Sequence, residues 1–249
     1  MTSFNEVTSS SVDPALPPSS NSRCPLTIVE WILIRFIHTK AYAWFARTIM
    51  AWFTFRIYGY PGFDMALYPK IKAAIAANPD EVMAFVGADH QSLSWIMTHM
   101  FSGANWGHAG FIRQGKDGEP EIVHVKGEGL LVWPLLQYLK ECDNFAVGKL
   151  VFKSDVEKAQ AKARMAWLIN IAPVVQYDYP MTMDQRSLEV VARMIVPNPG
   201  ETVELYCSEA VFAVGQGLVK QPFNGRMVDG LLVFEPDDVY RGCEILFEG

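Results

Sequence analysis

An extended apolar stretch, residues 203–206, changes at Cys207 into a helical apolar stretch, residues 208–214. This change of pattern predicts a strand that leads directly into a helix, with the cysteine at the helix start. The thiol then lies near unpaired backbone N–H groups and the positive end of the helix dipole, which lower a thiol pKa. We therefore expect Cys207 to be a nucleophile. The alternative is a buried structural thiol, because free cysteine is among the most buried residue types.

A nucleophilic cysteine needs a base, and His108 is the candidate. Small residues flank His108 and leave its imidazole approachable, and residues 109–113 continue as a strand. A second strand, residues 121–125, alternates so that His124 and Ile122 share one face. If the two strands pair as a hairpin, the two histidines approach each other on that face, and the second orients the first.

Three local strings in this order resemble a known family: Trp-Gly-His-Ala-Gly-Phe at 106–111, Ile-Val-His-Val at 122–125 and Tyr-Cys-Ser-Glu-Ala-Val at 206–211. They resemble the circularly permuted papain-like hydrolases of the NlpC superfamily, in particular the YiiX-like group. The resemblance extends over residues 80–243. Its supporting strings are residues 80–86, 92–96, 129–135, 177–179 and the Glu-Pro-Asp-Asp-Val string at 235–239.

The resemblance implies that Cys207 is the nucleophile, that His108 is the general base and acid, and that His124 takes the third, polar position. Chain order does not matter to such a triad, because only its geometry decides the chemistry. YiiX-like members often carry a carboxylate at the third position, whereas His124 resembles the arrangement in lecithin retinol acyltransferase-like enzymes. Acyl transfer therefore stays open beside hydrolysis.

The substrate pocket is expected to include aromatic and acidic residues near the triad, namely Trp106, Tyr177, Asp178 and Tyr206. Of these, Tyr177 and Asp178 are expected to shape the pocket or to pack beneath it rather than to transfer protons. The backbone N–H of Cys207 is the natural first donor to an oxyanion. The second donor is not identified by the sequence. Residues that could line the cleft near it are Gly87, Asp89, His90 and Gln91. For His90 we favour a packed or surface position, which is the more common setting of a lone histidine beside a helix.

A zinc site built from His108, His124 and Cys207 is the metal-dependent alternative. No closely spaced cysteine or histidine pair supports it, so we expect neither a metal nor another cofactor. The other three cysteines lack the strand-to-helix setting and are interpreted as ordinary thiols: Cys24, Cys142 and Cys243.

The composition sets outer limits on the function. A chain of 249 residues is long enough to bury a core without disulfides, and its four cysteines have no short paired spacing. This pattern fits a reducing, cytoplasmic location. The formal net charge of −6 gives no basic surface for nucleic acid, so nucleic acid is excluded as a partner.

The N-terminal quarter differs from the rest of the chain. Residues 1–23 are rich in Ser, Thr, Pro and Asn and are expected to be disordered. Residues 24–60 hold two apolar helical segments, neither with the ~18 uncharged residues of a membrane span. Two interpretations stay open: an extra layer packed on the core, or a hairpin on a membrane surface in which residues 26–58 make the contact. Residues 61–249 form the predicted hydrolase domain.

Helices are expected near residues 90–101, 134–141 and 154–170 and after Cys207, and a strand at 231–234 is followed by a short tail. Helices and mostly antiparallel strands are segregated in this order of elements, which indicates an α+β fold. We expect a thiol hydrolase that cleaves an amide or ester bond through an acyl-enzyme on Cys207. A peptide, an amide or a lipid ester would each suit this chemistry as substrate. The alternatives are an acyltransferase at a membrane surface and a catalytically idle binding protein on the same fold.

Overall fold

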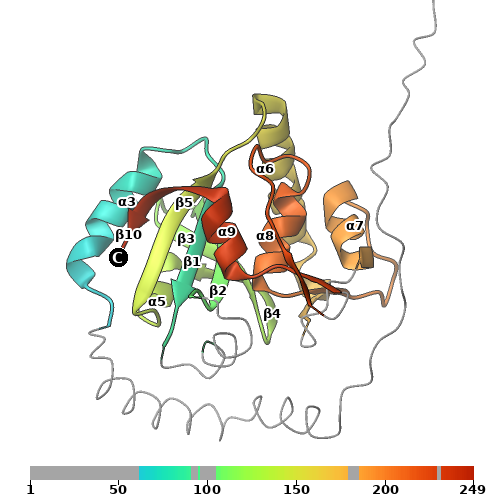
Figure 1. Cartoon of the computed structure of the whole chain (residues 1–249), viewed down its shortest axis with the longest axis horizontal. Coiled ribbons are helices and arrows are strands. Elements are labelled where there is room, and N and C mark those ends of the chain that lie inside the picture. The colour runs from blue at the N-terminus through green and yellow to red at the C-terminus, as the bar shows by residue number, and fades with distance from the viewer. Residues whose placement is uncertain (1–61, 91–94, 96–104, 179–184, 229–230) are drawn as a thin grey trace, which may run out of the picture.

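The protein is built around a six-stranded antiparallel sheet that lies between two groups of helices in the computed structural model (Figure 1). The structure describes residues 62–90, 95, 105–178, 185–228 and 231–249. The strand order is β10-β5-β1-β2-β3-β4. The strands span β1 Met83–Ala88, β2 His108–Gln114, β3 Pro120–Lys126, β4 Gly129–Pro134, β5 Asn144–Leu150 and β10 Cys243–Glu248.

Two small strand pairs lie outside this sheet. Strands β6 (Val175–Tyr177) and β7 (Val203–Leu205) pair in parallel, with Tyr177 opposite Leu205. Strands β8 (Arg226–Val228) and β9 (Leu231–Val233) pair antiparallel. The parallel pair matters for the site, because β7 ends two residues before Cys207.

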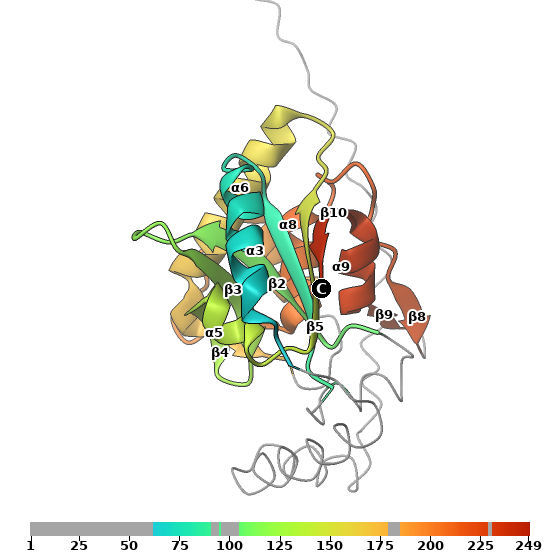
Figure 2. The same ribbon diagram turned by 90° about the vertical axis from the view of Figure 1, so that its left-hand side faces the viewer.

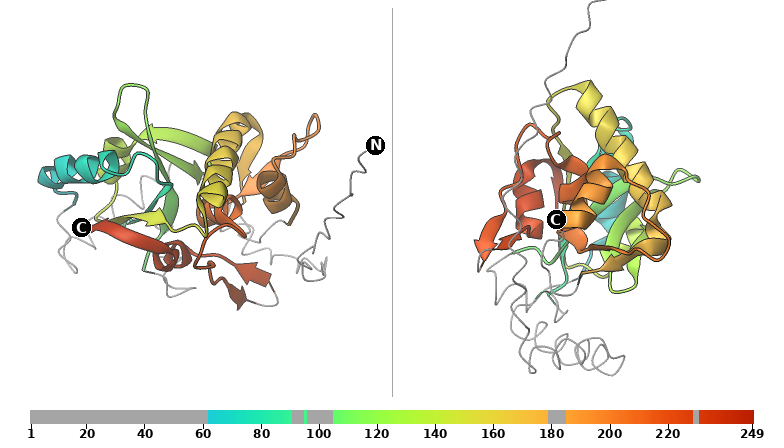
Figure 3. Two further views of the ribbon diagram at one scale, coloured as in Figure 1. Left: turned by 90° about the horizontal axis from the view of Figure 1, so that it is seen from above. Right: turned by 90° about the vertical axis from the view of Figure 1, so that its right-hand side faces the viewer.

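Helices cover both faces of the sheet, as the turned views show (Figures 2 and 3). One face carries α3 (Tyr68–Ala76) and α5 (Leu135–Leu139), and the other carries α8 (Cys207–Gly215), with α6 and α7 outside it. The remaining helical elements are η1 Met65–Leu67, α6 Asp155–Asn170, η2 Ala172–Val174, α7 Gln185–Arg193 and α9 Pro236–Gly242. This arrangement confirms the predicted α+β class.

The alternation of side chains along the strands creates two separate apolar layers. On one face, Phe85 and Ile122 pack with Ile71 of α3. On the other face, Phe111 and Val123 pack in the same cluster as residues of α8. The central strand β1 is buried along its whole length, which fits its apolar sequence.

Most of the predicted elements are present. The hairpin is β2 and β3, the helices expected at 134–141 and 154–170 are α5 and α6, and α8 begins at Cys207 itself. The strand expected at 231–234 is β9. Strand β10 was not predicted: a short tail was expected there, whereas β10 pairs with β5 at the sheet edge.

Three predictions fall wholly or mostly outside the described residues. They are the disordered tail at 1–23, the apolar segment 24–60 and the helix expected at 90–101. Among the helices that the structure describes, none combines the length and the apolar character needed to cross a membrane.

Candidate functional site

The two predicted histidines form a hydrogen-bonded pair. His108 is the first residue of β2 and His124 lies on the neighbouring strand β3, and the distance between His108 Nε2 and His124 Nδ1 is 3.0 Å. Gly110 makes this approach possible, because a Cβ at that position would lie 3.1 Å from the Cβ of His124. The strand pairing inferred from the sequence therefore brings the two imidazoles together.

Both imidazoles are held in the neutral form. Burial lowers the pKa of His108 well below its usual range, and the nearby His124 and Lys126 add to this effect. Burial, with a smaller contribution from Lys126, lowers the pKa of His124 to about 3. A buried imidazole beside a cation resists protonation because the charged form loses hydration and is repelled.

The hydrogen bond restricts which tautomer of His108 can act as a base. If His108 donates from Nε2 to His124 Nδ1, its own Nδ1 carries a lone pair and can accept a proton. His124 then carries its proton on Nε2, an atom that is buried and has no hydrogen-bond partner among the described residues. The pair is thus suited to hold His108 in the base-competent tautomer.

The sequence analysis did not identify Tyr138 as part of this site. The Tyr138 ring in α5 lies 5.3 Å from the ring of His108 and 5.0 Å from that of His124, measured between centroids. The Trp133 ring also lies close to His124, with ring centroids 5.2 Å apart. Lys126 places its Nζ 4.5 Å from the centroid of Trp133, close to the pair whose pKa it lowers. Lys126 lies two residues after His124 on β3, so the two side chains share one face of the strand. This spacing is the sequence signal that could have identified Lys126.

Cys207 is the first residue of α8, and its side chain is buried with 6% exposure. The preceding residue, Tyr206, has an extended backbone, as expected of the residue that precedes a helix. Backbone N–H groups of Ala109, Ser208 and Cys207 itself favour the thiolate. The predicted junction and the predicted N–H donors are both present.

The expected low pKa of this thiol is wrong. Burial raises the pKa of Cys207 above its ordinary value and outweighs the donors that lower it. The sequence pattern indicated the helix start but not the loss of hydration around the sulfur, which disfavours the charged form. In the resting protein, Cys207 is therefore a neutral thiol.

Cys207 approaches the histidine pair at the end of the sheet where β2 begins. Helix α8 packs on one face of the sheet, whereas the histidine rings lie with Tyr138 on the other face. The sulfur lies at the N–H of Ala109, next to His108, and its negative charge would raise the pKa of Tyr138. No direct hydrogen bond joins Cys207 and His108 among the described contacts; catalytic bonds are often long before substrate binds.

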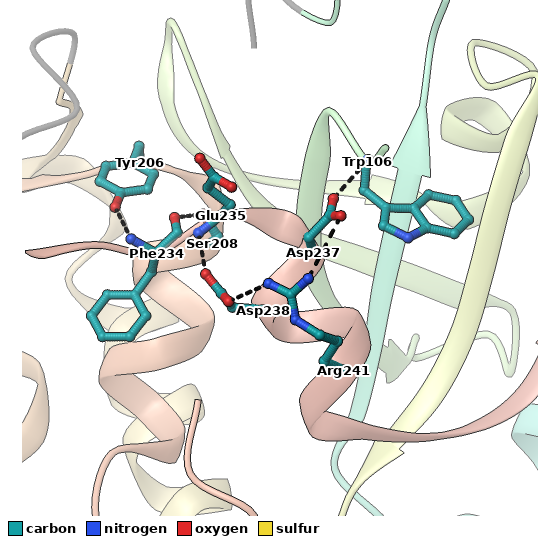
Figure 4. Close-up of polar contacts among 8 residues, drawn as sticks. All are labelled: Trp106, Tyr206, Ser208, Phe234, Glu235, Asp237, Asp238 and Arg241. Carbon is teal, nitrogen blue, oxygen red and sulfur yellow. Dashed lines mark hydrogen bonds and ion pairs between the residues drawn. The ribbon is translucent and has the colours of Figure 1, made fainter. Parts of the chain in front are cut away.

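Two of the predicted pocket residues are buried in structural contacts (Figure 4). The Tyr206 hydroxyl accepts a hydrogen bond from the Phe234 N–H at 2.9 Å. The Trp106 N–H donates to Asp237 Oδ1 at 2.9 Å, and its ring lies 5.2 Å from that of Tyr240. Their contact with a substrate stays a prediction.

The other two predicted pocket residues contact the strand that leads to Cys207. Tyr177 is paired with Leu205 in the parallel β6–β7 ladder, and the Asp178 N–H donates to the Leu205 carbonyl at 3.1 Å. The Asp178 residue is only 2% exposed. This position fits the part of the prediction in which the two residues pack beneath the pocket.

The loop after β1 carries a buried histidine, His90, that is paired with an aspartate. Gly87 lies opposite His108 in the β1–β2 register, and His90 Nδ1 lies 2.5 Å from Asp143 Oδ1. The His90 ring also contacts Trp95, with centroids 4.1 Å apart. His90 is therefore a packed residue, which the sequence analysis had favoured over a role in the cleft.

Comparisons with known proteins gave little beyond a distant structural likeness. No protein-family model matches the chain, and no curated protein matches it. The chain is similar to the crystal structure of yiiX from Escherichia coli O157:H7, described as a metalloprotein. The TM-score is 0.48 with 11% sequence identity, and the match covers 69% of this chain and 97% of that one.

Proposed function

We propose that the protein is a thiol hydrolase in which Cys207 attacks the carbonyl of an amide or ester. The observation that carries the proposal is the 3.0 Å bond between His108 and His124, formed beside a helix-start cysteine whose sulfur meets the Ala109 N–H. A nucleophile, a base and a group that orients the base are the three parts that such chemistry needs.

The reaction begins from neutral partners, because burial raises the pKa of Cys207 and lowers that of His108. As the Cys207 sulfur forms a bond to the carbonyl carbon, the thiol proton passes to His108 Nδ1. His108 then gives this proton to the leaving amine or alkoxide as the C–N or C–O bond breaks. A water molecule, deprotonated by His108, attacks the thioester and releases the acid and the free thiol.

The backbone around the sulfur supplies the second oxyanion donor that the sequence left unidentified. The N–H groups of Cys207 and Ala109 both point to the thiol region. They stabilise negative charge that develops on the carbonyl oxygen during attack. Losing one such donor typically costs about 2.7–4 kcal/mol of transition-state stabilisation.

A zinc site made of His108, His124 and Cys207 fits the geometry poorly. The two imidazole nitrogens that face each other are bonded to one another, so they are not directed at a common third point. Among the described residues, no group of three His, Cys, Asp or Glu side chains is arranged to hold a metal ion. Covalent catalysis by the thiol accounts for the contacts more completely.

The test is a turnover screen with four substrate classes: a peptidoglycan-type peptide, an isopeptide, a small amide and a lipid ester. Wild type is compared with Cys207→Ala, and Cys142→Ala serves as the matched control for loss of a buried thiol. We expect turnover and a mass adduct on Cys207 in wild type and Cys142→Ala, and neither in Cys207→Ala. Turnover that survives Cys207→Ala would refute the proposal.

The same screen separates hydrolysis from acyl transfer. A primary amine is added to the substrate that turns over, and the products are quantified by mass spectrometry. Hydrolysis predicts that the free acid dominates at millimolar amine. An amide product that dominates under these conditions would identify an acyltransferase instead.

A further inference from the structure

The segment that begins α9 contacts both parts of the chain that carry the candidate catalytic residues (Figure 4). We call residues 234–238 the bridge segment. It contains most of the acidic string that the resemblance singled out without giving it a role. Its contacts are with residues that lie directly beside Cys207 and two positions before His108.

On the nucleophile side, the backbone of Phe234 is held by the two residues that flank Cys207. Its N–H donates to the Tyr206 hydroxyl at 2.9 Å, and its carbonyl accepts from the Ser208 hydroxyl at 2.6 Å. The Phe234 ring stacks on Phe212, one helical turn further along α8, with centroids 3.6 Å apart. The bridge segment therefore fixes the first turn of the helix that begins at Cys207.

On the base side, Asp237 holds the backbone that leads into β2. Its Oδ1 accepts the Trp106 N–H at 2.9 Å in a buried contact. The next residue, Gly107, donates its N–H to the Gly87 carbonyl at 3.1 Å. Two consecutive backbone groups before His108 are thus fixed, one by the bridge segment and one by β1.

Hydrogen bonds within α9 keep these two attachment points at a fixed separation. Asp238 Oδ2 accepts the Glu235 N–H at 2.9 Å and so caps the helix start. The Arg241 guanidinium donates to Asp238 Oδ1 at 2.6 Å and lies 4.0 Å from Asp237 Oδ2. A capped helix start is a rigid unit, so a shift at one end is passed to the other.

We infer that the bridge segment sets the distance between Cys207 and His108, with Asp237 and the Tyr206 hydroxyl as positioning residues. The inference rests on the proposed function, since that distance governs turnover only if the two residues exchange a proton. The sulfur and the imidazole come from opposite faces of the sheet, so the sheet alone does not fix their separation. The bridge segment contacts both the residues that flank Cys207 and the backbone that leads to His108.

Three variants test this inference: Tyr206→Phe, Asp237→Asn and Asp237→Ala. The first measurement is the rate at which iodoacetamide alkylates Cys207, with His108→Ala as the reference for a thiol without its base. The second is the separation of kcat from KM on a substrate that the wild type turns over. A misplacement of about 1 Å can cost on the order of 10²-fold in rate.

We expect Asp237→Ala to alkylate at nearly the rate of His108→Ala and to lose about 10²-fold in kcat with KM unchanged. Asp237→Asn should lose much less, because its amide oxygen can still accept the Trp106 N–H. Tyr206→Phe should lower kcat and leave KM unchanged. A raised KM with normal kcat would instead assign Tyr206 to the substrate pocket and overturn its positioning role.

The control is Ile71→Val in α3, which weakens packing on the face of the sheet opposite α8 and the bridge segment and removes none of the hydrogen bonds of that segment. It should melt earlier but alkylate at the wild-type rate. If the bridge variants behave like Ile71→Val, the inference is wrong. The alkylation comparison needs no substrate, so a wild type without turnover would refute the proposed function and leave this test intact. If Asp237→Ala does not fold, the alkylation rates and kcat values of Tyr206→Phe and Asp237→Asn test the inference instead.

Discussion

Lys126 holds its ammonium group 4.8 Å from the centroid of Tyr138, whose ring contacts both members of the histidine pair. Glu141 accepts a hydrogen bond from the same ammonium at 3.0 Å and fixes its position. A cation held there opposes protonation of His108 and His124. The His108 imidazole is thereby kept neutral over a wider range of acid pH.

Removing this cation should shift the pH profile. In Lys126→Gln, the pKa of His108 rises, because one of the causes that lower it is gone. The acid limb of the kcat/KM profile, which reports protonation of the free base, should therefore move to higher pH. Lys149→Gln, at a lysine paired with Glu244 on the edge strand, is the matched control and should leave the limb in place.

The stability of the protein should fall as the pH drops below about 6.5, the ordinary pKa of histidine. The folded state keeps His124 neutral down to a pKa of about 3, whereas the unfolded chain binds a proton near 6.5. Because folding lowers the pKa of His124, the contribution of this residue to stability is fully present above pH 6.5 and is lost as the pH falls toward 3. Melting temperatures of His124→Asn should decline less steeply over this window than those of wild type.

Alkylation of Cys207 should accelerate with pH through the neutral and alkaline range, without a plateau at acid pH. Burial raises its thiol pKa, as it does for Cys142 and for Cys243, whose pKa is raised to about 12. Only Cys207 has several backbone N–H groups that favour the thiolate, so it should react first of these three. Mass mapping of labelled peptides checks the order, and earlier labelling of Cys243 would contradict it.

Loss of the base should be more severe than loss of the group that orients it. We expect His108→Ala to lower kcat by about 10²–10⁴-fold, the usual range for a general base. His124→Ala should cost less, and His124→Asn less again, because its side-chain oxygen can accept from His108 Nε2. Steady-state kinetics on the three variants decide this. Equal losses in the two His124 variants would mean that the position acts through packing alone.

Gly110→Ala should disrupt the histidine pair without touching either ring directly. The new Cβ would lie 2.9 Å from the Val123 carbonyl oxygen and 3.1 Å from the Cβ of His124. A backbone carbonyl in a paired strand cannot easily yield, so strain of about 1–3 kcal/mol is expected. Urea unfolding should show this loss, and kcat should fall together with it.

The chemistry-bearing residues were predictable where local pattern decides their place. The turn between two alternating strands was enough to bring His108 and His124 together, and the change of periodicity at Cys207 was enough to find the helix start. Both signals come from neighbouring residues in the chain. Tyr138 was not predictable, because it reaches the site through the packing of α5 beneath the sheet.

The pKa of Cys207 and the long-range contacts could not be predicted from the sequence, because both depend on packing between residues that are distant in the chain. The helix start at Cys207 indicated a low thiol pKa, but the extent of burial reversed the direction. The bond from Trp106 to Asp237 joins residues 131 positions apart, and no periodicity reports such a pairing. Strand β10 was missed because its partner β5 lies about a hundred residues earlier.

The order of these contacts along the chain has a consequence for synthesis. His108, His124 and Cys207 all leave the ribosome before Phe234 and Asp237 do. A nascent chain that has exposed its thiol and its imidazoles still lacks the bonds that hold Tyr206, Ser208 and Trp106. The proposed nucleophile therefore emerges before its contacts with the bridge segment can form, and a chain on a ribosome paused before residue 234 does not yet have them.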